Sequence, residues 1–156
     1  MFVCLGNICR SPTAEAVLKH LVEERGCEKD FVIDSAGLIS YHQGELPDPR
    51  MRSHASKRGY RLDSLSRPVC TDDFFDYDWI IGMDNRNIDQ LKQLAPDLES
   101  EAKIHQMTEY SSRTDYDYVP DPYYSGAEGF ELVLDLLEDA CRGLLDVILQ
   151  EGTASR

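Results

Sequence analysis

The chain has 156 residues, a formal net charge of −13 and an apolar content of 42 %. This length and composition are typical of a soluble globular protein, and we expect a single domain over residues 1–156. The negative charge argues against nucleic acid and against anionic membranes as partners. We also expect no membrane span and no signal peptide, because no apolar run is long enough for either.

Cysteine and histidine usage predicts the compartment and argues against a metal site. Five cysteines are an odd number in a chain without a recognisable secretory signal. We therefore expect free thiols and a cytoplasmic location. The four histidines, at positions 20, 42, 54 and 105, show no metal-ligand spacing and do not cluster with the cysteines. We expect no metal and no other cofactor.

The first twelve residues form the most informative segment. Residues 1–3 resemble a short apolar strand, and Pro12 suits the first position of a helix that Ser11 could cap. A loop between a strand and a helix aims several backbone N–H groups at one point, next to the positive end of the helix dipole. Cys4 and Arg10 bracket this loop, so a nucleophilic thiolate would face an anion such as phosphate.

The five residues between Cys4 and Arg10 can wrap around a tetrahedral oxyanion. Gly6 permits unusual backbone angles, and Asn7 tolerates the left-handed region best among non-glycine residues. Arg10 can bind two phosphate oxygens. The same donors favour the thiolate form of Cys4, and Ser11 could stabilise that thiolate as a leaving group. The predicted phosphate-binding residues are Leu5, Gly6, Asn7, Ile8, Cys9 and Arg10.

Residues 4–12, with the sequence CLGNICRSP, resemble the signature of the low-molecular-weight protein tyrosine phosphatases. Cys-x5-Arg alone is shared by several phosphatase classes, whereas the full string at a strand–helix junction is specific. The resemblance implies the flavodoxin-like phosphotyrosine protein phosphatase I fold, a three-layer sandwich with strand order 2-1-3-4. It also implies that Cys9 protects Cys4 from irreversible oxidation. Family members usually have several apolar residues before the position of Val3, whereas only two precede it here, so we expect either a very short first strand or a chain that lacks a few residues.

Apolar spacing along the rest of the chain predicts alternating strands and helices, hence an α/β fold with a parallel sheet of four strands. The second strand should be buried on both faces, because its apolar residues follow one another. Residues 151–156 are expected to fray. The predicted helices cover residues 12–25, 49–58, 71–74, 84–94 and 125–150, and the strands after the first cover residues 31–37, 77–83 and 103–107.

Three positions between residues 35 and 64 gain a meaning from the resemblance. An equivalent of the segment around Ser35 lies beside the catalytic loop in the family, so Ser35 could bond Asn7; a solvated strand end is the alternative. Tyr41 matches an aromatic residue on the pocket wall, although it could be an ordinary surface anchor. Many family members have His where this chain has Ser64, so we expect weaker support of the loop from that position.

Asp121 lies between two prolines, which project its carboxyl group from a stiff loop. A turn-forming Asp is the simplest interpretation. The segment Asp-Pro-Tyr-Tyr matches the family's general-acid loop, which implies that Asp121 is the general acid and then the general base. We expect Tyr123 or Tyr124 to face Tyr41 across the pocket. The resemblance also implies that these two tyrosines are phosphorylation targets.

The leading functional prediction is hydrolysis of phosphotyrosine and small aryl phosphates through a phosphocysteine on Cys4, with phosphotyrosine proteins as partners. A thiol-dependent arsenate reductase is the alternative enzyme, but Cys27, Cys70 and Cys141 are not paired by short spacing. A non-catalytic phosphotyrosine-binding module would need neither a nucleophile nor an acid. The sequence leaves open whether the chain is a monomer, which we expect, or a weak dimer.

Overall fold

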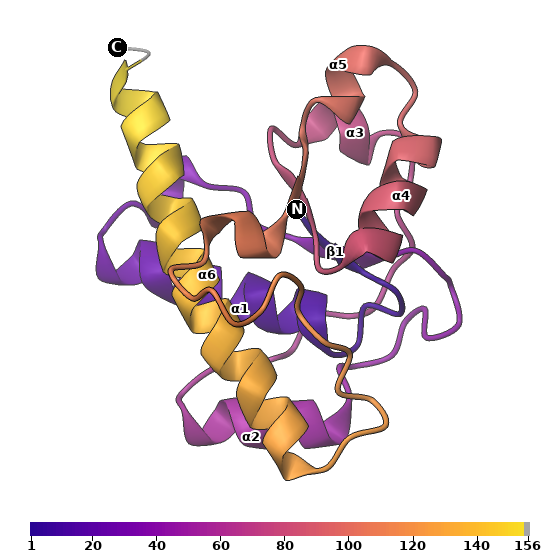
Figure 1. Ribbon diagram of the computed structural model, residues 1–156, viewed down its shortest axis with the longest axis vertical. Coiled ribbons are helices and arrows are strands. Elements are labelled where there is room, and N and C mark those ends of the chain that lie inside the picture. Colours follow the sequence, from indigo (N-terminus) through magenta and orange to yellow (C-terminus); the bar gives the residue numbers. More distant parts are fainter. Residues whose placement is uncertain (155–156) are drawn as a thin grey trace.

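The computed structural model describes residues 1–154 and has an α/β fold around a parallel sheet (Figure 1). Four short strands lie in the order β2-β1-β3-β4, and every neighbouring pair is parallel. The fold class and the strand order predicted from the sequence are therefore confirmed. The strands are β1 Phe2–Cys4, β2 Ser35–Gly37, β3 Ile80–Gly82 and β4 Ile104–Gln106.

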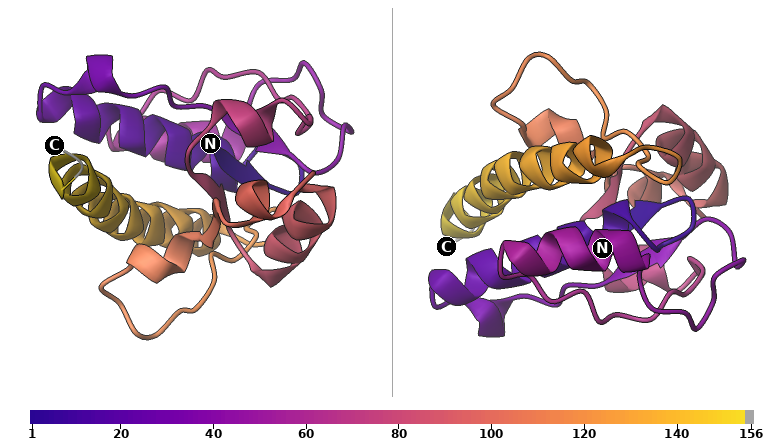
Figure 2. Two further views of the ribbon diagram at one scale, coloured as in Figure 1. Left: turned by 90° about the horizontal axis from the view of Figure 1, so that it is seen from above. Right: turned by 90° about the horizontal axis from the view of Figure 1, so that it is seen from below.

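Helices cover both faces of the sheet, with α1, α2 and α6 on one side and α3, α4 and α5 on the other (Figure 2). None of the helices within residues 1–154 is both long enough and apolar enough to cross a membrane. The helices are α1 Arg10–Glu24, α2 Pro49–Lys57, α3 Asp73–Asp76, α4 Asn85–Leu94, α5 Leu98–Glu101 and α6 Ala127–Ala154, with 3₁₀ turns η1 Glu28–Asp30 and η2 Met107–Tyr110.

The alternation of side chains along the strands divides the core into two clusters. Phe2 belongs to the cluster beneath α1 and α6, together with Leu134. The adjacent Val3 belongs to the opposite cluster, together with Phe74 of α3 and Leu91 of α4. Successive side chains of a strand point to opposite faces of a sheet, so both faces of β1 are buried. This arrangement explains why even very short strands hold the loop that follows β1.

The start of α1 corrects the sequence prediction. The helix begins at Arg10 rather than at Pro12, and Cys9 rather than Ser11 occupies the N-cap position, without a side-chain cap. Pro12 is then the third helical residue. Proline is tolerated there because the first turn's N–H groups have no partner within the helix. The consequence is that Arg10 belongs to the first helical turn and is not part of a free loop.

Other predicted boundaries are also wrong, at β3 (residues 80–82 rather than 77–83), at α3 (residues 73–76 rather than 71–74), at the second strand and at the end of α6. The second strand covers only residues 35–37, and Val32 is 82 % exposed, so the preceding apolar run is not buried on both faces. The reason is that β1 begins at Phe2, whose N–H bonds Asp34, and leaves no neighbouring strand for residues 31–33. At the other end, α6 continues to Ala154, where fraying was expected from residue 151. Residues 155–156 lie outside the described part of the chain.

Candidate active site

The loop from Cys4 to Arg10 lies at the carboxyl end of β1, beside the carboxyl end of β3. This edge is where parallel α/β sheets gather their binding loops. A pocket of about 440 Å³ opens there and contains all the predicted pocket tyrosines and the predicted acid. Its lining residues are Cys4, Leu5, Gly6, Ile8, Cys9, Arg10, Ile39, Tyr41, His42, Asp121, Tyr123 and Tyr124.

Carbonyl groups of this loop are bonded outside the loop. Gly6 O accepts from Ser66 Oγ at 3.1 Å, and Ile8 O accepts from Asp48 N at 2.8 Å. A planar trans peptide points its N–H opposite to its carbonyl, so the N–H that follows each of these carbonyls turns back toward the loop centre. The loop therefore has the geometry of an oxyanion cradle.

The serine that supports the loop is Ser66 and not Ser64. Ser66 is buried and donates to the loop carbonyl, whereas Ser64, two residues earlier, is half-buried. The sequence prediction considered only Ser64, because that is where the family usually has histidine. The sequence alone does not show which of the two serines in this connector faces the phosphate loop, so it cannot show which one supports it.

A chain of hydrogen bonds leads from the buried Glu15 to Cys4. Ser35 Oγ donates to Glu15 Oε1 at 2.6 Å, and Asn7 Nδ2 donates to Ser35 Oγ at 3.0 Å and to Ser11 Oγ at 2.8 Å. Ser11 Oγ lies 3.0 Å from Cys4 Sγ. An ionised carboxylate only accepts, so the Ser35 proton points to Glu15 and the amide protons of Asn7 point to the two serines. Ser11 is thereby left to donate its own proton to Cys4.

This series of hydrogen bonds holds Asn7 in place. Its φ of 56° lies in the left-handed region, as predicted, and its predicted hydrogen bond to Ser35 is present. Its side-chain oxygen accepts from Arg67 N at 3.1 Å. Arg67 itself pairs with Asp34 at 3.0 Å and with Asp73 at 2.9 Å. The strained residue is thus held by groups from three separate segments.

Arg10 is buried, with 3 % of its side chain exposed, and faces two carboxylates. Its Nη1 donates to Asp84 Oδ2 at 2.7 Å and to Val119 O at 3.0 Å. Burial lowers the pKa of Arg10, but the interactions with Cys4 and with Asp84 outweigh burial and raise it. Its Nη2 lies 3.7 Å from Asp121 Oδ2. The guanidinium is therefore cationic and oriented between the loop and the predicted acid.

Asp84 has a second role that the sequence prediction missed. Its Oδ1 accepts from Asn87 N at 2.9 Å and caps α4. Its Oδ2 is the partner of Arg10. The available signal was topological, because a residue at the carboxyl end of β3 must lie beside the loop that follows β1 when these strands are neighbours.

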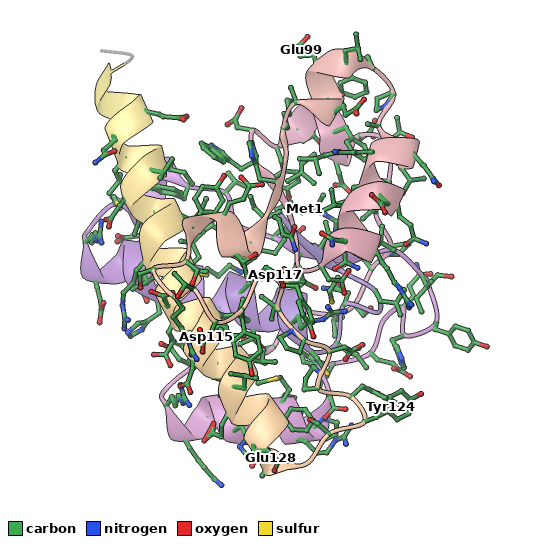
Figure 3. The ribbon with its side chains drawn as sticks, in the orientation of Figure 1. Met1, Glu99, Asp115, Asp117, Tyr124 and Glu128 are labelled. Carbon is green, nitrogen blue, oxygen red and sulfur yellow. The ribbon has the colours of Figure 1, made fainter. Side chains whose placement is uncertain are left out.

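Asp121 and the tyrosines form the mouth of the pocket. The side chain of Asp121 is 45 % exposed, and its Oδ1 accepts from Tyr123 N at 3.1 Å. Tyr41 and Tyr124 are 87 % and 96 % exposed. Figure 3 shows Tyr124 extending outward from the loop before α6. The structure thus brings the predicted acid and the predicted tyrosines to the pocket that Cys4 lines.

Cys9 differs from Cys4 in its surroundings. Burial, followed by the nearby carboxylate of Asp48, raises the pKa of the Cys9 thiol, so this thiol remains protonated. All five cysteines are free. Cys27, Cys70 and Cys141 are not among the residues that line the pocket.

Fold and site together define an α/β protein with an oxyanion pocket built around a cysteine. The model of the low molecular weight phosphotyrosine protein phosphatases matches residues 1–154. A low molecular weight protein-tyrosine-phosphatase of Streptomyces coelicolor is 40 % identical over 99 % of this chain and 96 % of its own length. The chain belongs to the low molecular weight phosphotyrosine protein phosphatase family, which confirms the family and the enzyme class predicted from the sequence.

Solved structures of similar chains agree with this assignment. A protein tyrosine phosphatase from Entamoeba histolytica is 46 % identical and has a TM-score of 0.92, with coverage of 97 % of this chain and 96 % of that chain. A Drosophila arginine phosphatase is 35 % identical, with a TM-score of 0.88 and coverage of 94 % and 95 %. The two names differ in the phosphorylated residue, so similarity to these structures does not by itself identify the phosphorylated residue that this chain hydrolyses.

Proposed function

We propose that this chain hydrolyses phosphotyrosine in proteins, and small aryl phosphates, through a phosphocysteine on Cys4. One observation carries the proposal: Cys4, Arg10 and Asp121 all line one pocket, with Arg10 Nη2 and Asp121 Oδ2 3.7 Å apart. A phosphoryl group bound by Arg10 would therefore have its ester oxygen within reach of the carboxyl group of Asp121.

The first step transfers the phosphoryl group to sulfur. The Cys4 thiolate attacks phosphorus, and the S–P bond forms while the P–O bond to the phenol breaks. The loop N–H groups and Arg10 stabilise the charge on the equatorial oxygens. Protonated Asp121 donates its proton to the departing phenolate, which leaves as neutral tyrosine.

The second step returns the enzyme to its starting state. The Asp121 carboxylate accepts a proton from water while that water attacks phosphorus, and the S–P bond breaks to release inorganic phosphate. The Cys4 thiolate leaves with a hydrogen bond from Ser11. Because each cycle begins with a thiolate Cys4 and a protonated Asp121, we expect the highest activity at mildly acidic pH.

The walls of the pocket support an aryl phosphate as the substrate. Tyr41, Tyr123 and Tyr124 line it and can stack against a phenyl ring. A pocket that binds phosphoarginine is expected to present an ionised carboxylate to the guanidinium of the substrate. Among the described residues that line the pocket, Asp121 is the single carboxylate, and its proposed role as acid requires it to be protonated. This composition favours phosphotyrosine over phosphoarginine.

Matched peptides that carry phosphotyrosine, phosphoarginine or phosphoserine at one position test the substrate class. We expect a kcat/KM at least about 100-fold higher for phosphotyrosine, because only this substrate uses the aromatic walls. A higher kcat/KM for phosphoarginine would replace the proposed substrate. A Cys4→Ser variant that still hydrolyses p-nitrophenyl phosphate would remove the phosphocysteine mechanism itself.

The other two functions receive less support from the site. Arsenate reduction needs further cysteines that pass on a disulfide, and the remaining three cysteines lie outside the residues that line the pocket. Arsenate-dependent oxidation of a thioredoxin would establish that activity. A binding module has no use for an acid beside its anion site, and one turnover assay with p-nitrophenyl phosphate separates binding from catalysis.

We also propose that Cys9 protects Cys4 in a reducing, cytoplasmic setting, which is in keeping with five free cysteines. Peroxide would oxidise the Cys4 thiolate to a sulfenic acid, and Cys9 sulfur would then form a disulfide with release of water. The raised pKa of Cys9 makes this second step slow. Loss of thiol-reversible recovery in Cys9→Ser supports the role, and unchanged recovery removes it.

A further inference from the structure

Asp48 and Arg50, at the start of α2, connect the phosphate loop to a salt bridge. Asp48 N donates to Ile8 O of the loop at 2.8 Å. The carboxylate of Asp48 is buried and accepts from Arg50 Nε at 3.2 Å and from Arg50 Nη2 at 2.9 Å. The same carboxylate caps α2 through Arg50 N at 2.8 Å. The guanidinium of Arg50 is thus fixed relative to the phosphate loop.

The other side of this guanidinium contacts the loop that carries Asp121. Arg50 Nη2 donates to Tyr123 O at 3.0 Å. The Arg50 guanidinium also lies over two rings, 5.4 Å from the centre of Tyr123 and 4.9 Å from the centre of Phe130. Tyr123 N in turn donates to Asp121 Oδ1 at 3.1 Å. Direct contacts therefore run without a gap from the phosphate loop to the carboxylate of Asp121.

We propose that Arg50 is a positioning residue that holds Asp121 over the phosphate loop. This inference rests on the proposed function, in which Asp121 is the general acid. Asp121 is 45 % exposed, so its carboxylate needs an external constraint to keep one position. The planar guanidinium can bind a carboxylate and a carbonyl while it stacks on two rings, which the ammonium of lysine cannot do.

The dependence of the rate on the leaving group tests this role. A poor leaving group such as phenolate needs the proton from Asp121, whereas dinitrophenolate leaves readily without it. We expect Arg50→Ala to lower kcat/KM for phenyl phosphate by about 10-fold, a fraction of what a general acid contributes, and for dinitrophenyl phosphate by less than about 2-fold. An equal loss on both substrates, or no loss on either, would overturn the proposal.

Two further variants separate geometry from charge. Arg50→Lys keeps the positive charge but lacks the planar guanidinium and its several N–H donors, so we expect it to behave like Arg50→Ala. Wild-type behaviour of Arg50→Lys would overturn the proposal. Arg52→Ala, on the same helix, removes a guanidinium whose Nε donates to Leu62 O at 3.3 Å and should leave the leaving-group dependence unchanged. Arg50→Gln retains part of the stem over Phe130 and replaces Arg50→Ala if the latter does not fold.

A double-mutant comparison with Asp121→Asn distinguishes failure of this inference from failure of the proposed function. We expect Asp121→Asn to increase the dependence on the leaving group, and Arg50→Ala to add nothing in that background. If Asp121→Asn increases the dependence and Arg50→Ala alone does not, the role of Arg50 is wrong and the proposed function stands. If Asp121→Asn has no such effect, the acid assignment fails, and the role of Arg50 fails with it.

Discussion

The phosphate loop and the loop around Asp121 meet at one pocket but are built in opposite ways. The phosphate loop is mostly buried, and Asn7, at its centre, is bonded to Ser11, Ser35 and Arg67. In the loop around Asp121, the side chains of Asp121 and Tyr124 are exposed, and the loop is bonded to α2 through Arg50. Oxyanion binding is therefore preorganised, whereas the position of the proton donor depends on few contacts.

This difference has a kinetic consequence. A defect in the phosphate loop should slow every substrate, because each transition state needs the same oxyanion donors. A defect in the loop around Asp121 should slow only substrates with poor leaving groups. Three kinetic predictions test this separation, and a fourth concerns the stability of the fold beside the phosphate loop; they are given in decreasing order of expected effect.

Arg10→Ala should have the largest effect. Removing the guanidinium deletes charged donors to the transferring phosphoryl group, so kcat/KM should fall by about 1,000-fold or more. The loss should be similar for phenyl and dinitrophenyl phosphate in steady-state assays. The change also leaves the half-buried carboxylate of Asp84 without this partner, so thermal unfolding must show that the variant is folded. A loss of less than about 10-fold would contradict the assigned role of Arg10.

Asp121→Asn should have a large but selective effect. The amide keeps the shape of the side chain and cannot supply an acidic proton, so kcat/KM for phenyl phosphate should fall by about 100-fold. The rate on dinitrophenyl phosphate should change far less. A pH profile supplies the control, because the decline of activity at alkaline pH should disappear in this variant. Equal losses on both substrates would place Asp121 in phosphate binding instead.

Ser35→Ala should have a moderate effect on all substrates. It breaks the series of hydrogen bonds from Glu15 to Cys4. One lost hydrogen bond corresponds to a decrease of about 5- to 10-fold in kcat/KM. Glu15→Gln is a matched test, because the amide of Gln can donate as well as accept. It therefore no longer forces the Ser35 hydroxyl to be the donor in this hydrogen bond. In both variants, inactivation of Cys4 by iodoacetate should require a higher pH. If the pH dependence of inactivation is unchanged in both variants, the series of hydrogen bonds does not stabilise the Cys4 thiolate.

The smallest expected effect concerns stability at acidic pH. Burial alone raises the pKa of Asp73, but hydrogen bonds from Arg67 and from Cys70 N outweigh burial and lower it. A lowered pKa contributes stability that is present above the unfolded value, about 4, and is lost as the pH falls through the folded value. Arg67→Gln should reduce this loss on acidification by about 1 kcal/mol in urea unfolding.

The control for that measurement is the exposed pair of Arg61 and Asp63. Arg61 is 90 % exposed, so Arg61→Gln should leave the pH dependence of the free energy of unfolding unchanged. Equal behaviour of the Arg61 and Arg67 variants would show that the pair of Arg67 and Asp73 does not stabilise the fold.

Local pattern was sufficient to predict a parallel α/β sheet, whereas the strand order and the three-layer arrangement came from the family resemblance. The alternation of strand and helix signals predicts a parallel α/β sheet, and the CLGNICRSP string marks the loop and its expected fold. Boundaries were less predictable, because they depend on neighbours in space. Residues 31–33 look like a strand, but β1 begins too late to pair with them. Pro12 looks like a first helical residue, but the helix starts two residues earlier.

The supporting residues were the hardest part of the site to predict. Ser66, Asp84 and Arg50 lie 60, 74 and 73 positions along the chain from their partners Gly6, Arg10 and Tyr123. Nothing local distinguishes such residues from an ordinary connector serine, helix cap or surface arginine. Their roles come from tertiary packing, which brings the ends of neighbouring strands together.

The central claim is that phosphate passes through Cys4, and trapping the phosphoenzyme tests it directly. Asp121→Asn should still accept a phosphoryl group from dinitrophenyl phosphate but should hydrolyse it slowly, because no base activates the water. After an acid quench, fragmentation mass spectrometry of the peptide from Met1 to Arg10 should find one phosphoryl group on Cys4, absent in the Cys4→Ser control. A phosphoryl group on Cys9, or none during sustained turnover, would contradict the mechanism.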